Sequence, residues 1–196
     1  MLPQIFNQLY AFHYAFLSAH GREDIVSVNL PWRGGYRVIS FYKILQHRLQ
    51  KPARPVVRAV RYASPGATDI SLIVEAARQI GEVVGIAVAA AGGVYALYDK
   101  IHKECSKREL LRIEVDRRKR ALKKEDLDFA IYASEQLAKI IGFERLSDVN
   151  GITGEDAINT LKIIMSYHRR LNVLVEYEQD GKAHFPKSGS RRQSDA

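Results

Sequence analysis

Hydrophobic positions near the start of the chain recur every three or four residues. Ile5, Leu9, Phe12 and Phe16 fall on one face of a helix, and the pattern stops near Gly21. This pattern predicts an aromatic-rich helix that packs on the body of the protein. The segment lacks a basic start and contains several polar residues, so we do not expect it to be a signal peptide.

The next part of the chain alternates between extended and helical patterns. Residues 25–30 (IVSVNL) and 56–62 (VVRAVRY) are β-branched runs that are typical of strands. The run between them, 36–49, fits both a strand and a helix, and its length favours a helix. Pro52 and Pro55 then end it. Strand, helix and strand predict a βαβ unit with parallel strands, whereas a strand at 36–49 predicts an antiparallel meander of three strands.

Residues 64 to about 98 have helical periodicity throughout. The segment starts with Ser-Pro, which suits a helix cap and the first helical position. Gly92-Gly93 predicts a kink or break, since each glycine costs a helix about 1 kcal/mol relative to alanine. Gly85, Ala89 and Gly93 repeat at four-residue spacing, which lets two helices approach closely. We therefore predict a helix contact through these three residues.

A strongly basic run follows the apolar segment. Residues 100–124 hold eleven Lys/Arg and four Asp/Glu, a net charge of +7 out of +8 for the whole chain. Apolar residues at helical spacing and pairs such as Glu104–Arg108 predict a helix that continues to Ile140 and stops at Gly142. Cations at helical pitch suit phosphate groups, and the alternative is a solvated helix face. The cations expected to face an anionic partner are Arg108, Arg112, Arg117, Arg118, Lys119, Arg120, Lys123 and Lys124.

The last third of the chain predicts a loop and one long helix. Residues 146–154 are expected to form the loop, and Thr153 with Asp156 resembles a capping box. The helix is expected over residues 155 to about 177. Its predicted inner face consists of Ala157, Leu161, Ile164, His168, Leu171 and Val175. The polar residues 181–196 are expected to be a disordered tail.

The uncharged run Val83–Tyr98 has two interpretations. Small residues, tyrosines at one end and a basic flank suit a membrane span. However, the run is shorter than the roughly twenty residues that a span needs. Extending it backwards adds Glu82 and Arg78, which are costly inside a bilayer. We therefore favour a core helix and keep a membrane protein as the alternative.

No motif predicts enzymatic chemistry, so we lean against an enzyme. Gly34-Gly35 lacks the rest of a phosphate-binding motif and is expected to form a turn. The six histidines are dispersed and Cys105 is the only cysteine, so we predict no metal site and no cofactor. His102 lies one helical turn from Cys105 but lacks a third group to orient the pair. His168 is expected to be a core histidine with one hydrogen bond.

These elements together predict an α+β fold that is mostly helical. A small two- or three-stranded sheet, over about residues 25–62, would pack with long antiparallel helices. We expect an α/β segment at 1–66 and a helical segment at 67–180, forming one continuous domain.

The function predicted from the sequence is interaction rather than catalysis. We expect a protein that contacts another protein, or a second copy of itself, through the small-residue helix contact and the basic helix face. The alternatives are a single-span or peripheral membrane protein with a cytoplasmic basic flank, and a nucleic-acid-binding protein. Either alternative gives the basic face an anionic surface as partner, and no small-molecule substrate is identified. With a single cysteine, the chain fits the reducing cytoplasm, and membrane association is the alternative.

Overall fold

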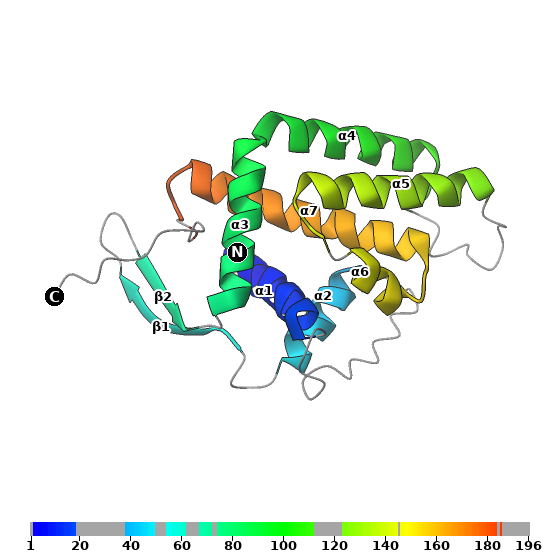
Figure 1. Ribbon diagram of the computed structural model, residues 1–196. Coiled ribbons are helices and arrows are strands. Elements are labelled where there is room, and N and C mark those ends of the chain that lie inside the picture. Colours follow the sequence, from blue (N-terminus) through cyan, green and yellow to red (C-terminus); the bar gives the residue numbers. More distant parts are fainter. Residues whose placement is uncertain are drawn as a thin grey trace.

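The structure is a computed structural model that describes residues 2–18, 38–49, 54–61, 67–71, 74–111, 123–144, 146–183 and 185. These residues contain seven helices and two strands. In chain order the elements are α1 (Leu2–Ser18), α2 (Val38–Arg48), β1 (Val56–Arg61), β2 (Ala67–Ser71), α3 (Val74–Ala89), α4 (Ala91–Lys107), α5 (Lys124–Ile140), α6 (Leu146–Thr153) and α7 (Ala157–Gln179). Figure 1 shows the helices gathered around α7, with the two strands to one side.

Helix α7 is the centre of the fold. It packs against α1, α2, α3, α5 and α6. Every residue from Ile158 to His168 is buried, so about three turns of this helix are covered on all sides. The long final helix predicted from the sequence is therefore confirmed. Its predicted inner face is buried too, except for Ala157, which is half-buried.

Helix α1 confirms the aromatic helix predicted at the start of the chain. Leu9 and Phe12 are fully buried. The Phe12 ring packs on Tyr167 of α7, with ring centroids 5.0 Å apart, and on Tyr42 of α2 at 5.8 Å. Aromatic rings that meet in tilted or offset pairs contribute beyond their buried area, so these contacts bind α1 to the centre. The side chain of Phe16 lies outside the described residues.

Helix α2 resolves the ambiguity over residues 36–49 in favour of a helix. Tyr42 and Leu45, one helical turn apart, are both buried. The Tyr42 hydroxyl donates a hydrogen bond to the backbone carbonyl of Ile163, at 3.1 Å. An alternating strand would turn these side chains to opposite faces, whereas the helix places them on one face toward the core.

The predicted α+β class is wrong, because the described part of the chain is predominantly helical. The strands β1 and β2 pair with each other in antiparallel order, from Val56 opposite Ser71 to Arg61 opposite Ala67. Figure 1 shows this hairpin beside the helices, not as a sheet layer that they cover. The expected partner strand, residues 25–30, lies outside the described residues. The extended segment pairs with its neighbour in sequence, since closing a short connection costs less chain entropy.

The helix predicted from residue 64 begins at Val74, because residues 67–71 form β2. Ser-Pro-Gly before β2 is also typical of turns, which explains the wrong prediction of a helix cap. The predicted break is confirmed but lies at Ala90 rather than at Gly92-Gly93. Helices α3 and α4 are bent by 91° there, so the two glycines lie in the first turn of α4 instead of interrupting a helix.

The single basic helix predicted to run to Ile140 is wrong, since α4 ends at Lys107 and α5 begins at Lys124. The chain leaves α4 through Glu109, whose φ of 55° is incompatible with a continuing helix. The predicted stop at Gly142 is confirmed, with φ of 67°. A Cβ at this glycine would lie 2.8 Å from Ile86 Cδ1, so glycine also permits the contact with α3.

Residues 146–153 form α6 rather than the predicted loop. Thr153 ends α6, where its hydroxyl donates to the Asn150 carbonyl at 3.0 Å and lies 2.8 Å from the Thr160 hydroxyl. The cap of α7 is Asp156, whose side chain accepts a hydrogen bond from the Asn159 amide at 3.0 Å. The capping motif was therefore placed three residues too early.

Candidate functional site

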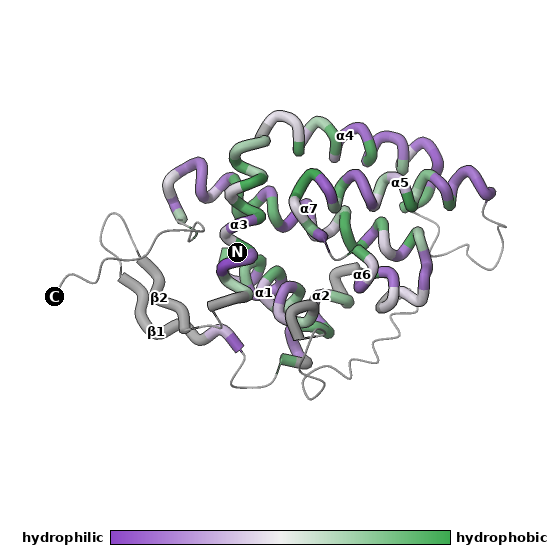
Figure 2. Tube along the Cα trace, viewed as in Figure 1, coloured by the Kyte–Doolittle hydropathy of each residue, from purple (hydrophilic) through white to green (hydrophobic). Residues whose placement is uncertain are grey.

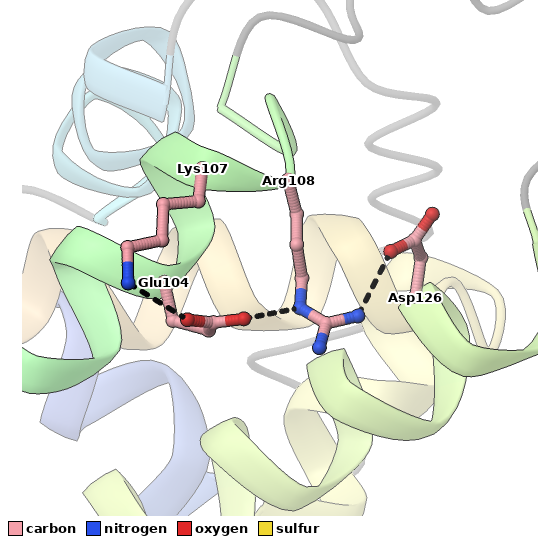
Figure 3. A network of polar contacts seen from close by, with 4 residues as sticks. All are labelled: Glu104, Lys107, Arg108 and Asp126. Carbon is pink, nitrogen blue, oxygen red and sulfur yellow. Dashed lines mark hydrogen bonds and ion pairs between the residues drawn. The ribbon is translucent and has the colours of Figure 1, made fainter.

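The ends of α4 and α5 are joined by a network around Arg108. Its Nε donates to Glu104 Oε1 at 2.9 Å, and its Nη1 donates to Asp126 Oδ1 at 3.2 Å. Figure 3 shows the Arg108 guanidinium lying between the two carboxylates. These hydrogen bonds raise the pKa of the Arg108 side chain, and the guanidinium also lies 4.8 Å from the Phe129 ring centroid. Arg108 therefore fastens the last turn of α4 to the first turn of α5.

Within the basic segment, residues 100–124, this network places the end of α4 and the start of α5 together at one end of a helical hairpin. Lys107 belongs to the network through Glu104, with Nζ and Oε2 3.9 Å apart. Lys123 and Lys124 are exposed at the start of α5. The remaining predicted anion-binding residues, Arg112, Arg117, Arg118, Lys119 and Arg120, lie outside the described residues. Of the predicted set, Arg108 has its charge matched by carboxylates of the chain itself.

A row of lysines on α4 was missed by the sequence analysis. Lys100, Lys103 and Lys107 are exposed and are spaced three and four residues apart, so they share the outward face of the helix. Lys103 pairs with Asp99 of the previous turn at 2.6 Å. Figure 2 shows hydrophilic and hydrophobic residues alternating along α4 and α5, as expected of helices with one buried face. The same spacing in the sequence would have identified the row.

Gly85 and Gly93 of the predicted small-residue contact meet no neighbouring element of the same chain within the described residues, and a contact with another protein or a second copy stays a prediction. Gly85 and Ala89 belong to α3, whereas Gly93 belongs to α4 beyond the 91° bend. A Cβ added at Gly85 or Gly93 would meet no atom of a neighbouring element within 4 Å. The bend therefore separates residues that a straight helix would align, and it leaves Ala89 and Gly93 exposed.

A buried hydrogen-bonded group of three side chains connects helices α1, α3 and α7. His13 Nε2 lies 2.8 Å from the Tyr167 hydroxyl, and His13 Nδ1 lies 3.1 Å from Gln79 Oε1. Burial raises the pKa of Tyr167, so its hydroxyl stays protonated. The group links α1, α3 and α7 and satisfies polar atoms that would be costly to bury alone.

Arg170 of α7 lies close to this group. Its guanidinium carbon is 3.9 Å from the Tyr42 ring centroid, and its Nε donates to Gln8 Oε1 at 2.7 Å. A further hydrogen bond, 3.0 Å long, runs from Nη1 to the Ser166 carbonyl. Burial lowers the pKa of Arg170. The Arg170 guanidinium is therefore stabilised by neutral hydrogen-bond acceptors and by the face of an aromatic ring.

His168 differs from the prediction of a core histidine with one hydrogen bond. Its side chain is fully buried, and neither ring nitrogen has a hydrogen-bond partner among the described residues. Instead, its ring stacks on Tyr98 of α4, with centroids 4.7 Å apart and planes at 14°. Burial lowers the pKa of His168 to about 4, so the ring is neutral at pH 7.

Cys105 lies buried near this stack, where its Sγ is 3.9 Å from Met165 Sδ. Burial raises the pKa of its thiol to about 11, which disfavours the reactive thiolate near neutral pH. His102 stacks on the Tyr98 ring at 5.9 Å. Among the described residues, no group of three His, Cys, Asp or Glu side chains is placed to hold a metal ion.

Two further findings concern membrane spans and similarity to known proteins. By length and composition, no described helix alone meets the requirements of a membrane span; α3 and α4 meet them only as a pair, across their 91° bend. No protein-family model, curated protein or solved structure matches the chain. The candidate site therefore rests on the geometry of the α4–α5 hairpin.

Proposed function

We propose that the protein is a non-enzymatic interaction protein that binds an anionic surface through its basic segment, residues 100–124. The observation that carries this proposal is the Arg108 network. Because Arg108 joins Glu104 on α4 to Asp126 on α5, the end of α4 and the start of α5 lie together. The segment to which both belong holds a net charge of +7 out of +8 for the whole chain. Concentrated cations attract phosphate-bearing partners and release their counterions on binding.

The cations of the segment divide into two groups. Arg108 is neutralised by Glu104 and Asp126 together. The exposed lysines remain available to a partner, because the ion pairs of Lys103 and Lys107 are themselves exposed and therefore weak. We assign the exposed lysines among the described residues of the segment to the binding surface: Lys100, Lys103, Lys107, Lys123 and Lys124.

The experiment is a titration of the full chain against two anionic probes at several salt concentrations. The probes are a short DNA duplex and vesicles that contain phosphatidylserine. We expect binding to at least one probe, and its affinity should fall steeply as salt rises. The double variant Lys123→Gln/Lys124→Gln should weaken that binding about tenfold or more, at roughly 1 kcal/mol per cation.

The matched control is Lys43→Gln/Lys139→Gln. It removes the same charge from two exposed lysines, one on α2 and one at the far end of α5. Its affinity should stay within about twofold of the unmodified chain, apart from the small effect of net charge. If both double variants lose affinity equally, the binding follows net charge alone and the assignment to the basic segment is wrong. Absence of salt-dependent binding to both probes would also reject it.

A further inference from the structure

We infer that the anionic surface is an acidic lipid membrane and that the outward face of α4 lies along it. This inference rests on the function proposed above and names its partner. The outward face consists of Gly92, Tyr95, Ala96, Lys100, Lys103 and Lys107, all exposed. Helical spacing places these residues on the side opposite Val94, Ile101 and Cys105, which are buried.

The outward face of α4 changes character along the helix. Its first part has no charge, because the uncharged run Val83–Tyr98 extends into α4 from the bend. Tyr95 is 65% exposed there, more than any other large hydrophobic side chain that the structure describes. Gly92 and Gly93 beside it leave the backbone bare, with open space where a Cβ would lie. The second part of the face carries the lysine row, together with Asp99, which pairs with Lys103.

This arrangement fits a bilayer surface better than a nucleic acid. Tyrosine prefers the headgroup level, where its ring is partly buried and its hydroxyl stays hydrated. A helix that lies in the interface gains from buried apolar area together with attraction between lysines and acidic headgroups. A duplex would engage the lysines through its phosphates but would leave Tyr95 and the bare start of α4 without a role. Membrane contact accounts for both parts of the face.

The bend between α3 and α4 determines which surface of the protein would contact the membrane. At 91°, α4 leaves α3 nearly at a right angle, and Figure 1 places α4 on the outside of the helical body. The outward face is therefore presented along a whole helix of seventeen residues instead of at one end. Such a surface suits a helix that lies on a membrane.

The experiment uses the full chain and cosedimentation with vesicles. Vesicles of phosphatidylcholine alone are compared with vesicles that also contain phosphatidylserine. Tyr95→Ser is expected to lower binding to the acidic vesicles about tenfold, since it removes an aromatic ring from the interface. The matched control is Tyr132→Ser on α5, a tyrosine that is 56% exposed but lies outside the α4 face. This control should bind as the unmodified chain does.

A second variant provides a readout that does not depend on lost affinity. Tyr95→Trp should retain binding, and its emission, compared with that of the unmodified chain, should shift to the blue when acidic vesicles are added. Circular dichroism of each variant checks folding, which should be intact because Tyr95 is largely exposed. An unchanged emission, or equal binding by Tyr95→Ser and the unmodified chain, would overturn the inference.

The outcomes also separate this inference from the function on which it rests. Salt-dependent binding to the DNA duplex, without binding to acidic vesicles, would overturn the lipid partner and leave the proposed function intact. Equal binding to vesicles with and without phosphatidylserine would exclude the lysine row as a contact and would also overturn the lipid partner. No salt-dependent binding to duplex or vesicles would reject both.

Discussion

Helix α7 and the α4–α5 hairpin each hold an arginine between helices, and they do so in opposite ways. Arg170 lies against the Tyr42 ring and the Gln8 amide, and burial lowers its pKa. Arg108 lies between Glu104 and Asp126, and these hydrogen bonds raise its pKa. The first cation is held by neutral groups inside the fold, whereas the second is neutralised by carboxylates near the surface.

This difference teaches which polar groups serve the fold and which remain for a partner. Around α7, polar side chains are enclosed, so their removal should cost stability. On the hairpin, Arg108 fixes the geometry while Lys123 and Lys124 stay exposed. Substitutions around α7 should therefore change the free energy of unfolding, and substitutions in the basic segment should change binding instead.

The largest expected effect is on packing. Ile164→Ala on α7 removes a fully buried side chain and should lower the free energy of unfolding by about 2–5 kcal/mol. Ile131→Ala on α5 removes a side chain that is 49% exposed, and it should cost about 0.5 kcal/mol or less. Urea unfolding of both variants tests the contrast. Similar losses would mean that α7 is not the centre of stability.

The next largest expected effect is a dependence of the free energy of unfolding on pH, caused by His168. Burial lowers the pKa of His168 to about 4 in the folded protein, against 6.5 for the unperturbed group. As pH falls below 6.5, the unfolded chain binds a proton that the folded chain does not bind until about pH 4. Stability should therefore fall by about 3 kcal/mol between these two pH values, because each pKa unit corresponds to about 1.4 kcal/mol.

His168→Phe isolates this contribution from that of the carboxylates, which also titrate in this range. Phenylalanine keeps a ring beside Tyr98 but takes up no proton. The difference in unfolding free energy between the variant and the unmodified chain should shift in favour of the variant as pH falls. A difference that stays constant with pH would show that His168 is protonated in the fold or is hydrated.

A smaller effect is expected from the buried hydrogen-bonded group. Tyr167→Phe removes the hydroxyl that lies 2.8 Å from His13 Nε2, with little change in volume. The loss should be about 1–3 kcal/mol, because a buried ring nitrogen is left without that partner. The melting temperature of the variant in thermal unfolding measures this loss of stability. An unchanged melting temperature would show that the contact between Tyr167 and His13 adds no net stability.

The smallest stability effect is expected at the hairpin. Arg108→Gln removes two hydrogen-bonded ion pairs that are partly exposed, so it should cost less stability than Tyr167→Phe. Lys107→Gln removes a single contact of 3.9 Å and should cost nothing measurable. Hydrogen exchange at the start of α5 should increase in the Arg108 variant alone. Equal exchange in both variants would contradict the role of Arg108 as a fastener.

The sequence predicted the helices well where the hydrophobic period is strong. The inner faces of α1 and α7 follow helical spacing, so their burial could be read directly, and Gly142 marked the end of α5. The choice of helix for residues 36–49 was also right, because Tyr42 and Leu45 needed one common face.

The errors arose where pairing in space decides the structure. Periodicity does not identify the partner of a strand, so residues 56–62 were assigned to a sheet with residues 25–30, whereas β1 pairs with β2. The end of α4 at Lys107 depends on Glu109 and on Arg108 meeting Asp126, eighteen residues further on. No local signal indicates that contact, and a continuous basic helix satisfied the same pattern of charges. The outward row of lysines was missed although its three- and four-residue spacing is visible in the sequence.

The most direct test of the central claim is the salt dependence of binding after four cations are removed from the basic segment. The variant Arg117→Gln/Arg118→Gln/Lys119→Gln/Arg120→Gln is compared with the unmodified chain on acidic vesicles and on the DNA duplex. We expect at least a hundredfold loss of affinity at low salt, from roughly 1 kcal/mol per cation, and a shallower dependence on salt. Equal affinity and an unchanged salt dependence would contradict the claim that this segment is the binding surface.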